Sequence, residues 1–161
     1  MEEPMKYDPM IEAVIRTHYD MVFHLAYART GNRPDAEDVV QEVFLRFIRR
    51  LPEFSDPEHE KAWFLRVTIN CSRSLFASLA KHPTAPLSDN AAGSLDPSSE
   101  LADLLSRLPQ KYRTVIHLFY YEDLRILDIA QLLGLNESTV KMQLTRARRL
   151  LKAYLEDEAD V

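Results

Sequence analysis

Apolar residues recur every three or four positions along most of the chain, a spacing that places them on one face of a helix. In residues 9–29 these positions are Ile11, Val14, Ile15, Val22, Leu25 and Ala26. A break at Gly31-Asn32 precedes a second helical stretch, 34–50, whose inner face holds Val40, Val43, Phe44, Phe47 and Leu51. Proline at a first helical position with acids behind it is typical of a helix start. The pattern therefore predicts two helices here.

The same pattern predicts further helices on both sides of a polar segment. Asp56-Pro57-Glu58 begins a stretch that is helical to residue 80, with an interruption expected at Asn70-Cys71-Ser72, where helix propensity is low. Residues 82–99 are rich in Pro, Ser, Ala, Asp and Asn, which is typical of a flexible linker. Later helices are expected at residues 100–107, 110–120, 126–133 and 138–155. The prediction is an all-α fold of two small helical bundles joined by a flexible linker.

Residues 124–152 have the layout of a helix-turn-helix motif. A short helix ends at Gly134, which can adopt the left-handed backbone conformation that a tight turn requires, and Asn136 or Glu137-Ser138 opens a second helix. In DNA-binding proteins of this layout the second helix enters the major groove. We therefore expect the C-terminal bundle to carry a recognition helix.

The second helix of this motif has two contrasting faces. Its apolar stripe consists of Val140, Leu144, Ala147 and Leu151, and its opposite arc consists of Ser138, Lys141, Met142, Thr145, Arg146, Arg149 and Lys152. That arc offers four cations, two hydroxyls and no acid, which suits phosphates and base edges. DNA binding is the favoured interpretation, and the alternative is a basic face that is merely solvated.

The distribution of charge supports this interpretation although the chain has a net charge of −5. Residues 61–83 carry 4 basic and no acidic side chains, and residues 107–152 carry 9 basic and 4 acidic ones. Residues 1–60 carry 13 acidic and 7 basic side chains. A polyanion responds to the local field, so two basic blocks predict two nucleic-acid surfaces, and the acidic remainder predicts weak binding by the chain alone.

Several other classes of protein are disfavoured. The single Cys71 excludes an internal disulfide framework and is typical of a reducing compartment. The acidic N-terminus lacks a signal-peptide pattern, and no apolar run reaches the roughly 20 residues of a membrane span, so we expect a cytoplasmic protein without membrane insertion. No glycine-rich phosphate loop is present, and we expect neither catalysis nor a metal or cofactor. The histidines show no metal-ligand spacing: His18, His24, His59, His82 and His117.

Two motifs resemble regions of the extracytoplasmic-function sigma factors, the group of the sigma-70 family that has only the second and fourth sigma domains. Residues 35–45 (DAEDVVQEVFL) resemble the region that docks on the coiled coil of the polymerase β′ subunit. The segment from Leu108 (LPQKYR) through Arg148 resembles the promoter-reading region. Both motifs occur in the family's order, with a linker between them, and the resemblance extends over residues 19–155.

This resemblance implies a division of the chain and a set of partners. Sigma domain 2 is expected at residues 8–81, a linker at 82–99 and sigma domain 4 at 100–156. The implied partners are core RNA polymerase, contacted at the β′ coiled coil and the β flap, promoter DNA, and an anti-sigma factor that holds the protein inactive. The implied function is promoter-specific initiation, in which the helix-turn-helix reads −35 DNA and sigma domain 2 captures melted −10 DNA.

The resemblance also implies residues for the polymerase and for the −35 element. Asp38, Gln41 and Glu42 match the polymerase-docking positions and share a helix face opposite the apolar stripe. The alternative, if the resemblance is set aside, is that these acids lie near a helix N-terminus only because they suit the helix dipole. The recognition helix is expected to contact −35 DNA through Ser138, Thr139, Lys141, Met142, Thr145, Arg146 and Arg149.

Residues 61–70 (KAWFLRVTIN) resemble the element that opens and reads −10 DNA. Asn70 matches a position that receives a base flipped out of the strand, and a helix cap is the alternative role for it. Arg66, Arg73 and Lys81 are expected to contact the phosphates of this single strand. Trp63, which neighbours Phe64 and Leu65, is expected in the core rather than under a stacked base.

The chain departs from the family pattern at four positions, and two other functions are open. Ser74 and Ala77 stand where Asp and Arg are common, and Met142 and Gln143 stand where a small polar residue and Arg are frequent, so no promoter sequence is transferred. A DNA-binding regulator with an N-terminal sensing or dimerisation domain would explain the helix-turn-helix but not the docking motif. A helical adaptor that binds only protein would leave both basic blocks solvated.

Overall fold

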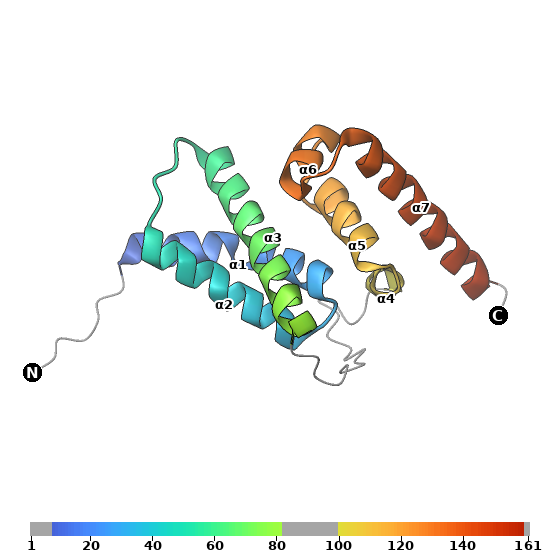
Figure 1. Ribbon diagram of the computed structural model, residues 1–161, viewed down its shortest axis with the longest axis horizontal. Coiled ribbons are helices and arrows are strands. Elements are labelled where there is room, and N and C mark those ends of the chain that lie inside the picture. The colour runs from blue at the N-terminus through green and yellow to red at the C-terminus, as the bar shows by residue number, and fades with distance from the viewer. Residues whose placement is uncertain (1–7, 82–99, 160–161) are drawn as a thin grey trace, which may run out of the picture.

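The computed structural model describes residues 8–81 and 100–159, and this part of the chain is helical without a strand (Figure 1). The elements are α1 (Pro9–Thr30), α2 (Arg33–Arg50), α3 (Pro57–Lys81), α4 (Glu100–Ser106), α5 (Gln110–Ile116), a π-helical turn η1 (His117–Tyr121), α6 (Ile126–Leu133) and α7 (Glu137–Ala159). The all-α fold with a C-terminal helix-turn-helix is confirmed. The predicted linker, 82–99, lies outside the described residues.

Local signals in the sequence set the ends of the first two helices. The Asp8 carboxylate accepts a hydrogen bond from the Met10 amide (2.9 Å), and the Asn32 side chain accepts one from the Asp35 amide (2.9 Å). Gly31 closes α1 in the left-handed conformation, with φ 77°. These caps satisfy backbone groups that a helix end leaves unpaired, which is why the boundaries fall where the sequence predicts them.

Helix α3 runs without a break through Asn70-Cys71-Ser72, so the predicted interruption is wrong, and so is a capping role for Asn70. Cys71 and Ser72 are buried, and the Ser72 hydroxyl donates to the Ile69 carbonyl at 2.7 Å. Packing and this hydrogen bond outweigh the weak local propensity, because a buried helix draws most of its stability from its apolar face.

The first three helices enclose an aromatic core. Phe64 is fully buried and packs against Phe44 and Phe47, with ring centroids 5.8 and 5.3 Å away. Trp63 is partly buried and meets the rings of Phe64 and Phe54 edge-on, at 4.9 and 6.0 Å. The prediction that Trp63 belongs to the core is confirmed.

A second apolar cluster joins the helices of the two expected domains. Leu25 of α1 and Leu65 and Ile69 of α3 are buried together with residues of α5, η1, α6 and α7. Figure 1 shows α5 and α6 beside α1 and α3. The α5–α7 members of this cluster are Tyr112, Val115, Ile116, Leu118, Ile129, Ala130, Val140, Leu144 and Ala147, with Leu108 just before α5. The two halves therefore share a hydrophobic core, and α1 and α3 form one side of it.

Candidate functional site

Helices α6 and α7 form the predicted helix-turn-helix. Gly134 ends α6 in the left-handed conformation, with φ 69°, and the Asn136 carboxamide oxygen accepts from the Thr139 amide at 2.8 Å at the start of α7. Val140, Leu144 and Ala147 are buried against the rest of the fold. The buried stripe fixes the rotation of α7 about its axis and turns the opposite arc to solvent.

The outer arc of α7 carries the residues predicted to contact −35 DNA. Thr139 is partly exposed, and the others are exposed: Ser138, Lys141, Met142, Thr145, Arg146 and Arg149. Lys141, Arg146 and Arg149 form no ion pair with the described residues. Unpaired cations on one helix face give this surface a positive field that a polyanion can reach.

Arg148, in the same basic run, faces a different environment. Its Nε donates to the Tyr120 hydroxyl at 2.7 Å, and its guanidinium lies 5.6 Å from the ring centroids of both Phe119 and Tyr120. These contacts attach α7 to the end of η1. Arg148 therefore has a structural role, whereas Arg146 and Arg149 remain available for a partner.

A face of α3 carries three of the four residues predicted for −10 DNA. Arg66, Asn70 and Arg73 are spaced by four and three positions, so they share one side of the helix, and all three are exposed. The side chain of Lys81 lies outside the described residues. Arg73 also reaches the other half of the fold, because its Nη2 donates to the Leu133 carbonyl at 2.8 Å, just before the helix-turn-helix turn.

The predicted polymerase-docking residues lie together on α2. Asp38 and Gln41 are exposed, and Glu42 is partly buried and pairs with Arg46, with Oε1 3.1 Å from Nε. Leu45, which sequence analysis did not single out, is 36% exposed and lies on the same face seven positions after Asp38. The sequence signal for Leu45 was its place as an apolar residue on the otherwise polar arc of an amphipathic helix. The face combines acidic groups with apolar area.

A polar junction connects the two halves near the end of η1. Glu122 Oε2 lies 3.4 Å from Lys61 Nζ, and Glu122 Oε1 lies 3.3 Å from His117 Nε2. Lys61 also donates to the Glu122 backbone carbonyl at 3.1 Å. Burial alone would raise the pKa of Glu122, but His117 and Lys61 outweigh burial and lower it. The junction therefore stabilises an ionised carboxylate between the halves.

Two arginines also cross between the halves, Arg29 buried and Arg113 partly buried, and sequence analysis missed both. Arg29 Nε donates to Ser72 Oγ at 2.9 Å, and its Nη1 donates to Thr114 Oγ1 at 3.3 Å. Arg113 Nε donates to the Ala28 carbonyl at 2.9 Å. Arg29 occupies the apolar stripe of α1, seven positions after Val22, and this position in the pattern was the available signal.

Other chemistry is absent from the part of the chain described here. Over residues 8–81 and 100–159 no group of three or more His, Cys, Asp and Glu side chains could hold a metal ion. Burial raises the pKa of the Cys71 thiol to about 11, so the protonated thiol predominates at neutral pH. No helix in these ranges has the length and apolar character needed to cross a membrane.

Comparisons with known proteins match both halves of the chain. Residues 14–81 match Sigma-70 region 2, and residues 98–151 match Sigma-70, region 4. The RNA polymerase sigma factor SigV of Bacillus subtilis strain 168 is 29% identical over 157 residues, which cover 92% of this chain and 93% of SigV. An RNA polymerase sigma-E factor of Streptomyces avermitilis is 30% identical over 154 residues, which cover 90% of this chain and 84% of that protein.

A solved structure has a similar arrangement of helices. CnrH, in complex with the cytosolic domain of CnrY, matches with a TM-score of 0.64 and 26% sequence identity. The match covers 91% of this chain and 88% of that one. The similarity therefore spans both halves and not only the helix-turn-helix.

Proposed function

This chain belongs to the extracytoplasmic-function group of the sigma-70 family, and we propose that it assigns the three tasks of a sigma factor to three separate surfaces. As an RNA polymerase sigma factor it binds core polymerase and DNA and directs transcription initiation. We assign sigma domain 2 to residues 8–81 and sigma domain 4 to residues 100–156. The polymerase supplies the catalytic groups, and this chain supplies none.

The first surface, the outer arc of α7, reads the −35 element in the major groove. Its proposed contacts are Ser138, Thr139, Lys141, Met142, Thr145, Arg146 and Arg149. The observation that carries this assignment is that Lys141, Arg146 and Arg149 are exposed and unpaired within the described residues, on the face opposite the buried stripe. Side chains held in this way can reach phosphates and base edges without first breaking an ion pair.

The second surface, on α3, captures the melted −10 strand. The exposed Asn70 amide is proposed to pair with the polar edge of a base that has left the stack. Arg66, Arg73 and Lys81 are proposed to contact the phosphates of the strand. Arg66 and Asn70 lie one helical turn apart, which suits a strand that follows the helix surface.

The third surface, on α2, docks on the β′ coiled coil of core polymerase through Asp38, Gln41 and Glu42, with Leu45 supplying apolar area. Acids on a partly apolar face suit a basic partner helix. We propose that residues 100–156 contact the β flap, and that the protein works in the cytoplasm, where core polymerase works. We also propose an anti-sigma partner, in line with the family and with the solved complex of CnrH, which contains the cytosolic domain of CnrY.

Run-off transcription with purified core polymerase on genomic fragments tests this proposal. The wild-type protein should yield discrete products that core polymerase alone does not. The double variant Arg146→Glu and Arg149→Glu should lose at least tenfold in product, because two phosphate or base contacts become repulsive. The matched control, Arg16→Glu and Arg33→Glu, changes the net charge equally at two exposed sites in sigma domain 2, where each arginine pairs with an acid four positions away.

The control should keep its product, since surface ion pairs contribute little to stability. Equal product from wild type and the Arg146/Arg149 variant would contradict the −35 assignment. Specific, tight binding of a promoter fragment in the absence of polymerase would instead favour an independent DNA-binding regulator.

A further inference from the structure

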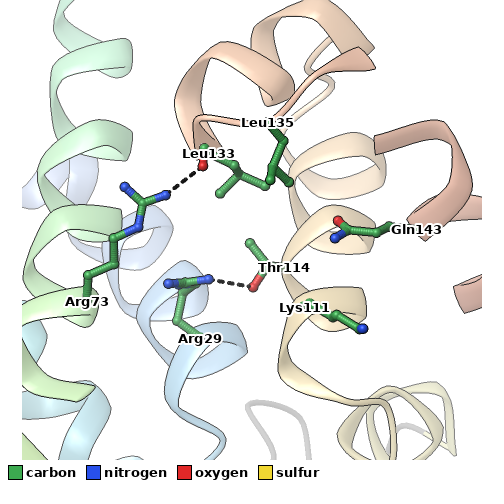
Figure 2. Close-up of a pocket in the computed structure, with 7 residues that line it drawn as sticks. All are labelled: Arg29, Arg73, Lys111, Thr114, Leu133, Leu135 and Gln143. Atoms are coloured by element: carbon green, nitrogen blue, oxygen red, sulfur yellow. Dashed lines mark hydrogen bonds between the residues drawn. The ribbon is translucent and has the colours of Figure 1, made fainter. Parts of the chain in front are cut away.

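A small cavity between the two halves has three cationic side chains and no acid among the described residues that line it. Its volume is about 200 Å³, and Figure 2 shows Arg29 of α1 and Arg73 of α3 on one side of it, with Lys111 on α5 and Gln143 on α7 across from them. Thr114 and two leucines complete the lining. Arg73 repels the buried Arg29 at this cavity, and the exposed Lys111 adds a third positive charge to the lining, so an anion bound there would relieve the repulsion.

Arg29 is the most deeply placed of these cations. Its exposed fraction is 8%, and within the described residues it bonds two hydroxyls and no acid. Burial, followed by repulsion from Arg73 and Arg113, lowers the pKa of Arg29 to about 10, so the guanidinium still carries its charge at neutral pH. Buried charges in proteins are normally paired, because desolvation of a lone ion is costly. The partner that would complete the environment of Arg29 is an anion.

Gln143 gives an independent sign of a ligand site. It is buried on the inner side of α7, and its Oε1 has no hydrogen-bond partner within the described part of the chain. A half-turn of the amide directs its NH₂ group where the oxygen now lies, and that group would donate to an anion. The cavity then offers guanidinium, ammonium and amide donors, and none of the described residues that line it is a carboxylate.

We propose that this cavity binds a small phosphate-bearing anion, which Arg29 and Arg73 of sigma domain 2 and Lys111 of sigma domain 4 hold together. At roughly 30 Å³ per water, the volume corresponds to about seven waters, which is enough for one or two phosphate groups. Guanidinium groups match phosphate oxygens in pairs of parallel hydrogen bonds. Three cations also favour a multiply charged anion over a single carboxylate.

The bound anion would link the two domains, because its donors come from α1 and α3 on one side and from α5 and α7 on the other. In this packed arrangement Arg73 also bonds the Leu133 carbonyl. The ligand would therefore compete with the −10 strand for Arg73. This competition rests on the proposed contact between Arg73 and the −10 strand. Binding of the anion does not depend on that contact.

Calorimetric titration and thermal unfolding of the full chain test the site, with inorganic phosphate and pyrophosphate as probes and sodium chloride at matched ionic strength. A probe present at ten times its Kd should raise the unfolding midpoint by about 3 to 5 °C. Arg73→Gln and Lys111→Gln should each weaken binding about tenfold, because each removes one charge-assisted contact. Both side chains are exposed, so these variants retain the core.

Arg33→Gln is the matched control, because it removes the same charge at an exposed site on α2 and should bind the probes like wild type. The proposal is overturned if chloride stabilises the protein as much as the phosphates do, or if all three variants bind like wild type. Equal binding of a glutamate-rich peptide would assign the cavity to an acidic protein partner instead. Stabilisation by a short single-stranded oligonucleotide but not by pyrophosphate would assign the phosphate to DNA. Binding of promoter DNA by the holoenzyme, in a buffer without phosphate or nucleotides, tests the proposed function separately.

Discussion

Replacing Glu122 by glutamine should weaken the junction between the two domains by an amount that depends on pH. The Glu122 carboxylate is 10% exposed and lies 3.4 Å from Lys61 Nζ and 3.3 Å from His117 Nε2. Breaking a fully buried ion pair costs about 3 to 5 kcal/mol, but Lys61 is 40% exposed and keeps its bond to the Glu122 backbone carbonyl. We therefore expect a loss of about 1 to 2 kcal/mol in the free energy of unfolding at neutral pH.

The sign of the pH dependence follows from the lowered pKa of Glu122. A carboxyl whose pKa is lower in the folded than in the unfolded state stabilises the fold fully above its ordinary value, here 4.5, and this contribution is lost as the pH falls through the lowered value. The glutamine variant has no such titration. The difference between wild type and Glu122→Gln should therefore shrink as the pH drops below 4.5.

Urea unfolding at pH 7 and at several values below pH 4.5 measures this difference. The control is Glu37→Gln, whose exposed carboxylate pairs with Arg33 on α2, and it should cost less than about 0.5 kcal/mol at each pH. The reasoning is refuted if Glu122→Gln costs no more than the control, or if its cost stays constant down to the lowest pH at which the protein folds.

Two further predictions concern DNA. The first uses the salt dependence of promoter binding by the holoenzyme, measured as the slope of log affinity against log salt concentration. Changing Arg146 and Arg149 to glutamine should make this slope shallower by about 1.8, because each duplex phosphate contact contributes about 0.9. Arg148→Gln should leave that slope unchanged, because Arg148 is held by Tyr120 and Phe119, and an equal change in both variants would contradict the assignment. Asn70→Ala should reduce run-off product at least tenfold while footprinting still shows protection of the upstream element. The control Ser78→Ala, at an exposed site about two turns further along α3, should not reduce the run-off product. Full product from Asn70→Ala would contradict the strand-capture role of Asn70.

The helices could be predicted because each has a clear apolar stripe and local end signals. Helix α6 has the predicted bounds, and α1 and α2 differ from prediction by one residue at one end. The error at Asn70-Cys71-Ser72 shows the limit of local propensity. Nothing near Ser72 in the sequence reveals that its hydroxyl accepts from Arg29, 43 positions earlier, in a buried contact.

The exposed faces of α2, α3 and α7 could also be predicted, since the buried stripe of a helix determines what its other side presents. The contacts between the domains could not be predicted in this way. The helix dipole favours a cation such as Arg29 in the last turn of α1, so the position of Arg29 in the sequence does not indicate a contact with the other domain. Its burial depends on Thr114 of a distant helix, and periodicity within one helix carries no information about a partner on another.

Arg73 connects the packing of the domains with the proposed capture of DNA. Its Nη2 donates to the Leu133 carbonyl, and this bond holds the guanidinium against the other half; if the side chain turns toward a −10 phosphate, the bond is given up. An exposed hydrogen bond of this kind contributes about 1 kcal/mol, or roughly a fivefold preference for the packed arrangement. A new hydrogen bond from Arg73 to a phosphate can offset a cost of that size, and docking of α2 on core polymerase would place the strand near it. We therefore expect the release of Arg73 to be favoured when polymerase and promoter bind together, in line with the prediction that the chain alone binds DNA weakly.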